Sequence, residues 1–255
     1  MSGWTAVVLA GSRPGRDRFA LAHGTDLKAL IPVGGVAMVR RPVEALLASD
    51  WIARVLVVGQ EPERIAAVLP DDPRLTVAQS ADTIAATLQA ICADPATGWP
   101  LLVTTGDHAL LDPVMIDDFC RRSSRTDISI GLVERRRLVK RLPGVRRTWI
   151  RFRGGAYSGA NLFQLRTPKS AVAIALWRAI EQDRKKSLRV LWQLGPVLFF
   201  GAALRLLTIE KVMHRLSLRL GLAVRIVEMR NPLAAVDVDK PSDHRLAEAI
   251  LAGRV

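Results

Sequence analysis

The sequence predicts an α/β fold built on a mainly parallel β-sheet flanked by helices. Short apolar, strand-like runs alternate with helical segments over the first two-thirds of the chain. This order is typical of right-handed strand–helix–strand crossovers. The length of 255 residues suits one large α/β domain with a sizeable core. Neither an internal repeat nor an obvious linker divides the chain, so we expect a single domain over residues 1–255.

The elements of the first part follow one another in a regular order. Asp112 is expected to cap a helix that has Pro113 at its first position. Ligands in such sheets bind at the C-terminal ends of the strands. The expected strands are 6–9, 55–58, 75–78, 101–104 and 128–133, and the expected helices are 36–48, 62–68, 83–93 and 112–123, with a loop over 11–24.

The pattern changes after residue 135. Gly154-Gly155 predicts a turn between two strands, and Ser242 is expected to cap a closing helix. Between them the sequence predicts a helical insertion at 187–220, apolar on one side and basic on the other. The elements expected in this part are strands at 149–152, 162–165 and 224–228, and helices within 170–185, 188–220 and 242–252.

The charge of the chain is concentrated in one segment. The chain has 37 Lys and Arg against 24 Asp and Glu, a net charge of +13, and 22 of the basic residues with 5 of the acidic ones lie within 134–230. Phosphates, nucleic acid or an anionic membrane surface would attract that segment. Two cysteines and four scattered histidines argue against a disulfide framework, a four-cysteine zinc site and a histidine metal cluster.

Neither a targeting signal nor a convincing membrane span is expected. Residues 4–10 are apolar but lack a basic segment before them and a cleavage site, so they read as a first buried strand. The run 190–207 is at the lower length limit for a bilayer span, and Gly195-Pro196 interrupts it. We expect a cytoplasmic protein, or one peripheral at the inner face of the membrane.

Three motifs carry residues suited to phosphate and metal chemistry. A Gly-rich loop with Gly11, Arg13 and Gly15 follows the first strand, and Lys28 comes after it; such loops cradle phosphates, although a flexible surface loop gives the same pattern. Asp107 follows a buried strand, which suits a divalent metal or a turn cap. Asp237 and Asp239 would share one face of an extended segment, as cation ligands or as a solvated strand end.

Together these motifs resemble the MobA-like nucleotidyltransferases, which have a GT-A-like, Rossmann-type fold. The resemblance covers essentially the whole chain and implies that the loop after the first strand holds a nucleoside triphosphate. It also implies that Arg13, or else Arg16, and Lys28 neutralise the phosphates as the catalytic cations. Implied Mg²⁺ ligands are Asp107 and Asp239, with Asp237 as an extra one, and implied nucleotide contacts are Leu9, Ala10, Gly11, Ser12, Gly15, Gln79 and Thr83.

The second half would recognise the acceptor. Asn161, between two expected strands, resembles an acceptor-binding turn, although a turn-forming Asn is an equal alternative. Arg146 and Arg147 could bind an acceptor phosphate. We therefore divide the expected domain into an NTP-binding half (1–133), an acceptor-binding half (134–230) and a metal-binding strand end with a closing helix (231–255).

The resulting hypothesis is Mg²⁺-dependent transfer of NMP from an NTP, with CTP weakly favoured, to a small phosphorylated acceptor with release of pyrophosphate. The alternatives are a GT-A-type glycosyltransferase and a non-enzymatic basic module that binds membrane or nucleic acid. Nucleic acid is not expected as a partner, because aromatic residues make up only 5% of the chain. The insertion 187–220 is explained best by an internal helical hairpin or a homodimer interface. The more specific alternative is that this insertion contacts an anionic membrane. The basic residues that would meet the lipid headgroups are Lys185, Lys186, Arg189, Arg205, Arg215 and Arg219.

Overall fold

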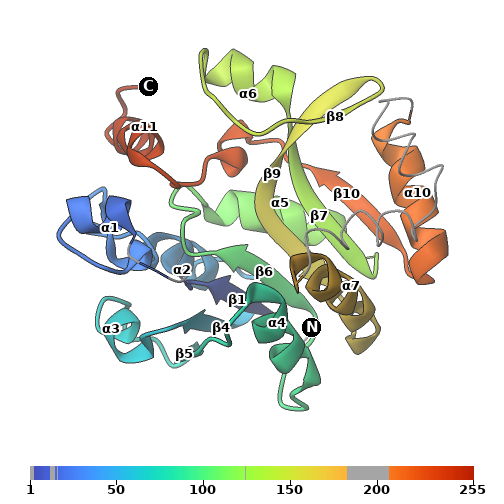
Figure 1. The fold of residues 1–255 in the computed structure, drawn as a ribbon, viewed down its shortest axis with the longest axis horizontal. Coiled ribbons are helices and arrows are strands. Elements are labelled where there is room, and N and C mark those ends of the chain that lie inside the picture. The colour runs from blue at the N-terminus through green and yellow to red at the C-terminus, as the bar shows by residue number, and fades with distance from the viewer. Residues whose placement is uncertain (1–2, 12–14, 16, 124, 183–206) are drawn as a thin grey trace.

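The protein has one eight-stranded sheet in the order β10-β7-β9-β6-β1-β4-β5, with β8 paired to β9 (Figure 1). The computed structural model describes residues 3–11, 15, 17–123, 125–182 and 207–255. All pairings are parallel except those of β9, which runs antiparallel to β6, β7 and β8. The strands are β1 (Trp4–Leu9), β4 (Ile52–Gly59), β5 (Leu75–Gln79), β6 (Leu101–Thr105), β7 (Ile128–Glu134), β8 (Ile150–Phe152), β9 (Gly155–Leu165) and β10 (Val224–Glu228). The predicted fold class is confirmed.

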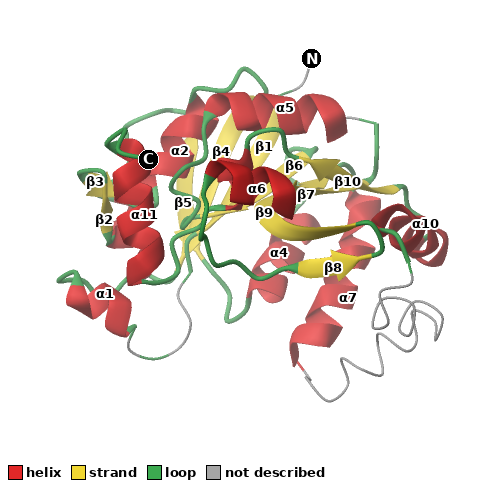
Figure 2. Cartoon of the chain, turned by 90° about the horizontal axis from the view of Figure 1, so that it is seen from above, coloured by secondary structure: helices red, strands yellow, loops and turns green. Residues whose placement is uncertain are grey.

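Helices cover both faces of the sheet. Figure 2 shows α2 and α5 on one side of it, and α4 and α7 on the other. The helices are α1 (Arg18–Ala22), α2 (Arg40–Leu47), α3 (Pro62–Ala66), α4 (Ile84–Ala93), α5 (Pro113–Ser123), α6 (Arg135–Arg141), α7 (Ala171–Gln182), α10 (Ile209–Leu220) and α11 (Pro241–Leu251), with 3₁₀ turns η1 (Lys28–Leu30), η2 (Pro168–Ser170) and η3 (Pro232–Ala235). No helix among the described residues has the length and apolar character needed to cross a membrane.

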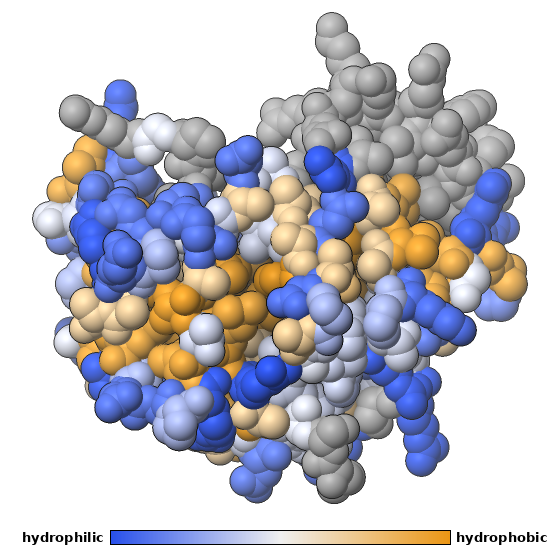
Figure 3. Space-filling view, turned by 90° about the horizontal axis from the view of Figure 1, so that it is seen from below, coloured by the Kyte–Doolittle hydropathy of each residue, from blue (hydrophilic) through white to orange (hydrophobic). Residues whose placement is uncertain are grey.

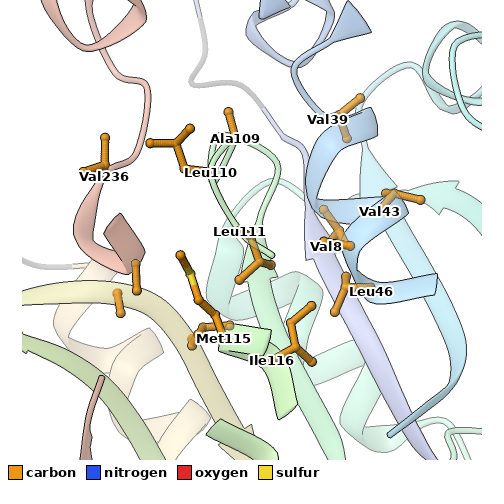
Figure 4. Close-up of a cluster of buried hydrophobic side chains, with 14 of the residues drawn as sticks. Val8, Val39, Val43, Leu46, Ala109, Leu110, Leu111, Met115, Ile116 and Val236 are labelled. Carbon is orange, nitrogen blue, oxygen red and sulfur yellow. The ribbon is translucent and has the colours of Figure 1, made fainter. Parts of the chain in front are cut away.

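The alternating side chains of β1 divide the core in two. Val8 packs with Val43 of α2 and Ile116 of α5 in the larger cluster (Figure 4), whereas Val7 packs with Leu88 of α4 on the opposite face. This is the burial expected of a central strand that is covered on both sides. The side of the edge strand β5 is less well covered: seen from below, apolar side chains stay visible amid hydrophilic ones (Figure 3).

Several predicted boundaries were wrong. The helix expected at 36–48 begins only at Arg40, because Gly34 and Gly35, with φ of +59° and +81°, turn a hairpin of β2 (Pro32–Val33) and β3 (Val36–Ala37) before it. The closing helix begins at Pro241, and Lys240 rather than Ser242 occupies the cap position. A proline at the first helical position needs no amide partner.

In the acceptor half, β9 is longer than the predicted strand 162–165. It begins at Gly155, so Asn161 lies inside the strand and not in a turn between strands. Asn161 has φ +47° and sits where the pairing of β9 with β7 shifts register. Only the last part of the insertion 187–220 belongs to the described residues. There α10 packs Met213 and Leu216 against the sheet and leaves Leu218 71% exposed.

Candidate active site

The C-terminal ends of the central parallel strands meet at one edge of the sheet. Leu9, at the end of β1, lies opposite Val58 of β4 and Thr105 of β6. The Ala10 amide donates to the Val58 carbonyl at 2.8 Å, and the Gly106 amide donates to the Leu9 carbonyl at 2.9 Å. The loops that leave these strands are therefore tied together where ligands bind in open parallel sheets.

Two glycines of the loop after β1 belong to the described residues. A Cβ on Gly11 would stand 3.2 Å from the side chain of Gln60, which follows β4. Gly15 has φ +105°, a conformation that disfavours any other residue. This fits a loop that brings its backbone close to a ligand. Three predicted positions of this loop lie outside the described residues: Ser12, Arg13 and Arg16.

Lys28 lies between the two carboxylates that were predicted to bind metal. Its Nζ is 2.7 Å from Asp107 Oδ2 and 2.5 Å from Asp239 Oδ1. The Thr105 hydroxyl donates to the other oxygen of Asp107 at 2.6 Å. Asp107 and Asp239 lie 79 and 211 positions after Lys28 in the chain, and both converge on its ammonium group.

The ionisation of this group follows from its charges. Burial alone would lower the pKa of Lys28, but Asp107 and Asp239 together raise it above its usual value. Burial acts to raise the pKa of Asp239, and the hydrogen bond and charge of Lys28 bring it below its usual value. Lys28 is therefore a cation and Asp239 an anion at neutral pH.

Asp237 belongs to a second ion pair beside the first. Both terminal nitrogens of Arg147 bind it, one through the carboxylate and the other through the main-chain carbonyl at 2.9 Å. Asn161 Nδ2 donates to Asp237 Oδ2 at 3.3 Å. Burial raises the pKa of Asp237; Arg147 lowers it and Asp239 and Asp107 raise it, which leaves it above the usual value.

This second pair engages two residues with predicted roles. Arg147 is only 8% exposed, and its guanidinium binds Asp237. Asp237 accepts from Arg147 and Asn161, whereas the cation between Asp107 and Asp239 makes no contact with it. Arg146, the neighbour of Arg147, is exposed and has no ion-pair partner among the described residues.

The segment that carries both aspartates is extended but does not join the sheet. Val236 and Val238 are buried while Asp237 and Asp239 point the other way, as the predicted alternation requires. The Val238 amide donates to the Asp107 carbonyl at 3.0 Å. This main-chain hydrogen bond joins the segment 236–239 to the end of β6.

Three supporting residues had no predicted role. Thr105 orients Asp107, and the buried Asp243 accepts from the Asp239 amide at 3.3 Å. His108 is fully buried beside Asp107, and burial lowers its pKa to about 4, so it packs as a neutral side chain. Thr105 and Asp243 stood inside the motifs already singled out, and their spacing from Asp107 and Asp239 was the available signal.

Two of the implied nucleotide contacts, Gln79 and Thr83, lie at the end of β5 and at the start of α4. Gln79 is exposed there, and the Ser80 amide donates to the Gly59 carbonyl at 2.9 Å. Thr83 caps α4 by accepting from the Ala86 amide at 3.1 Å, so its hydroxyl is already engaged. Ser80 Oγ is buried and has no hydrogen-bond partner within the described part of the chain.

The described residues contain no group of three or more His, Cys, Asp or Glu placed to hold a metal ion. Two carboxylates, Asp107 and Asp239, do converge on one cation position, which the Lys28 ammonium marks. Mg²⁺ is commonly bound through one or two carboxylates together with substrate phosphates and water. The donor set therefore fits Mg²⁺ delivered with a nucleotide.

Solved structures similar to this chain share its fold. The structure of a hypothetical transferase from Thermus thermophilus is 26% identical and has a TM-score of 0.78, with 95% of this chain and 99% of that chain covered. The 4-diphosphocytidyl-2C-methyl-D-erythritol synthase of Anaerococcus prevotii is 10% identical with a TM-score of 0.61, over 98% and 96% of the two chains. The 2-C-methyl-D-erythritol 4-phosphate cytidylyltransferase of Thermus thermophilus is 16% identical with a TM-score of 0.53, over 99% and 100%.

No curated protein matches the chain. The family model of the MobA-like NTP transferase domain matches residues 6–205, a range that includes the loop after β1, Lys28, Asp107 and Asn161. This match overturns the non-enzymatic alternative. The chain belongs to the MobA-like NTP transferase family and is a nucleotidyltransferase.

Proposed function

We propose that the protein transfers CMP from CTP to a small phosphorylated acceptor and releases pyrophosphate. The observation that carries this proposal is the convergence of Lys28 with Asp107 and Asp239 at the C-terminal edge of the sheet. The name of one structural neighbour, a cytidylyltransferase, supports CTP over the other nucleotides. Its name also gives a phosphorylated acceptor, which the basic acceptor half of this chain suits.

In the proposed reaction an oxygen of the acceptor phosphate forms a bond to the α-phosphorus. The bond between the α-phosphorus and the bridging oxygen breaks, and that oxygen leaves with pyrophosphate. No protein nucleophile is required, so the residues act through position and charge. Lys28 stabilises the charge that develops on the phosphates. Asp107 and Asp239 would hold Mg²⁺, which supplies further neutralisation of phosphate charge.

The remaining predicted contacts are assigned by position. Leu9, Ala10, Gly11 and Gly15 form the start of the loop that would hold the triphosphate. The exposed Gln79 would meet the base. Among the acceptor residues, the exposed Arg146 is the one free to bind a phosphate; Asn161 and Arg147 act by holding Asp237. Arg13 remains our choice for the cation of the loop.

Among the alternatives, a GT-A-type glycosyltransferase would need an Asp-x-Asp motif at the end of the central strand. Here β6 ends in Thr105-Gly106-Asp107-His108, which offers one aspartate. The proposal of nucleotidyl transfer is therefore preferred. A cytoplasmic location and a homodimer through 187–220 stay predictions from the sequence.

The test is pyrophosphate release with CTP, ATP, GTP and UTP, each with Mg²⁺ and a panel of phosphorylated sugars, polyols and amino alcohols. We expect release with CTP and a phosphorylated acceptor, and loss of release with a chelator. Release with another NTP in place of CTP would change the proposed base and leave the proposal of nucleotidyl transfer unchanged. Sugar transfer from a finished nucleotide sugar without pyrophosphate would overturn the proposal.

A further inference from the structure

Helix α6, strand β8 and the loop between them form a surface that we call the α6–β8 face. Residues 135–153 contain nine Arg and Lys and no Asp or Glu. Both elements lie along β9, α6 on one side of it and β8 on the other (Figure 2). The Arg135 guanidinium of α6 sits over the ring of Trp149, next to β8, at 5.9 Å. The exposed basic side chains of this face are Arg135, Arg136, Arg137, Lys140, Arg141, Arg146, Arg151 and Arg153.

Most of this charge has no counter-charge. Arg137 pairs with Glu228 at 2.9 Å, and Arg136 approaches Glu134 only at 3.7 Å. Arg147, which is buried, is neutralised by Asp237. Arg141 donates to the main-chain oxygen of Val255 at 3.1 Å. Among the described residues, no carboxylate side chain pairs with the other exposed cations, which are Arg135, Lys140, Arg146, Arg151 and Arg153. Cations left unpaired over a continuous face raise the potential there and favour an extended anionic partner.

An apolar residue is exposed among these cations. Ile150 of β8 is 51% exposed and lies between Arg146 and Arg151 in the sequence, next to the half-buried Trp149. Exposed aliphatic side chains ringed by Lys and Arg are typical of protein surfaces that enter the headgroup region of an anionic bilayer. The unpaired cations and the exposed Ile150 therefore both favour an anionic lipid surface as the partner.

Other partners fit less well. A small phosphorylated acceptor carries too few charges to use so many cations. Single-stranded nucleic acid is bound through exposed aromatic platforms, whereas Trp149 is covered by Arg135 and Phe152 packs beside Tyr157. A twofold dimer through this face would bring the same cations together, since an isologous interface pairs a surface with itself.

We propose that the α6–β8 face docks on a lipid bilayer with anionic headgroups. The loop of this face also supplies Arg147 to Asp237, so docking would hold the active-site edge of the sheet near the membrane. This inference goes beyond the proposed function and does not depend on which nucleotide is used. It rests on described residues alone.

The test is co-sedimentation of the full chain with phosphatidylcholine vesicles, with and without phosphatidylglycerol, at rising salt. The double variant Arg151→Glu/Arg153→Glu reverses two charges at the start of the β8–β9 hairpin. Arg166→Glu/Lys169→Glu makes the same charge change at the far end of β9, where both residues are exposed. Each basic residue near an anionic surface contributes about fivefold in affinity, so we expect a loss of at least about 25-fold in the first variant and much less in the second.

Two further measurements complete the test. Ile150→Ser should weaken the binding that survives at high salt. Pyrophosphate release with soluble substrates should be unchanged in Arg151→Glu/Arg153→Glu, which shows that the fold and the catalytic function are intact. Equal losses in both double variants, no binding of the unmodified chain to anionic vesicles, preferential binding of single-stranded RNA, or a dimer that only Arg151→Glu/Arg153→Glu dissolves would each overturn the proposal.

Discussion

Two ion-pair clusters lie side by side at the edge of the sheet, and they differ in how freely their cations can move from the carboxylates to a ligand. Lys28 binds Asp107 and Asp239 through one ammonium group, and Asp239 is 59% exposed. Arg147 binds Asp237 through two nitrogens and is 8% exposed. An ammonium on a flexible stem can move to a phosphate, whereas a buried guanidinium fork is fixed by its geometry. We therefore propose a chemical role for the first cluster and a positioning role for the second.

The largest expected effect tests the first cluster. Asp239→Asn or Asp107→Asn removes a carboxylate at the cation position, and we expect kcat/KM for pyrophosphate release to fall by about 100–1,000-fold, in line with loss of one charge-stabilising group. Asp72→Asn, which breaks a surface pair with Arg74, is the matched control and should leave activity intact. A fall of less than tenfold in both site variants would remove them from the reaction.

Next, activity rather than stability should separate the clusters. Arg147→Met leaves the Asp237 carboxylate with only Asn161, and we expect the free energy of unfolding to fall by about 1–3 kcal/mol. Lys28→Met leaves Asp107, 19% exposed, and Asp239 without the cation that they share, so we expect a similar fall of about 1–3 kcal/mol together with loss of pyrophosphate release in the folded variant. Urea denaturation measures the fall in both variants, and kcat of the folded variants separates the clusters, because only Lys28→Met should lose activity. An equal loss of activity in folded Arg147→Met would break the comparison.

A smaller effect should appear on acidification. The pKa of Asp239 is lowered in the folded chain, so its contribution to stability is full above the unfolded pKa of about 3.9 and is lost as pH falls through the folded value. The pKa of Asp237 is raised, so its contribution has the opposite sign. Thermal unfolding between neutral and acidic pH should show a shallower loss for Asp239→Asn than for the unmodified chain, and a steeper loss for Asp237→Asn. Parallel curves would contradict this assignment.

The smallest effect gives a reference outside both clusters. Thr83→Ala removes the cap of α4 and should cost about 1 kcal/mol of stability, whereas Thr83→Ser should cost less. The Thr83 oxygen accepts from the Ala86 amide, and we expect no change in KM for the nucleotide in either variant. A rise in KM in Thr83→Ala that Thr83→Ser does not show would support Thr83 as a nucleotide contact through its hydroxyl.

The sequence predicted most of the parallel half of the fold correctly. Apolar runs that alternate with helical segments predicted the positions of β1, β4, β5, β6 and β7. Asp112 with Pro113 predicted the start of α5, which the structure confirms. These features are local, because strand burial and helix capping depend on a few adjacent residues. The length of β9 depends on pairing with distant segments, and the local pattern did not contain that information. The split of 36–48 comes from the local hairpin at Gly34-Gly35, which the helical pattern of the following residues concealed.

For the site, the sequence alone pointed to the Gly-rich loop, Lys28, Asp107 and the Asp237–Asp239 pair, because these residues lie in motifs whose order and spacing along the chain can be read directly. Only the tertiary structure decided how they combine: Lys28 meets Asp107 and Asp239, and Arg147 with Asn161 takes Asp237. Each carboxylate accepts the donors that the folded chain places within hydrogen-bond distance, and those donors come from segments about 80–210 residues away. Residue types therefore fixed the available charges, and long-range packing fixed their partners.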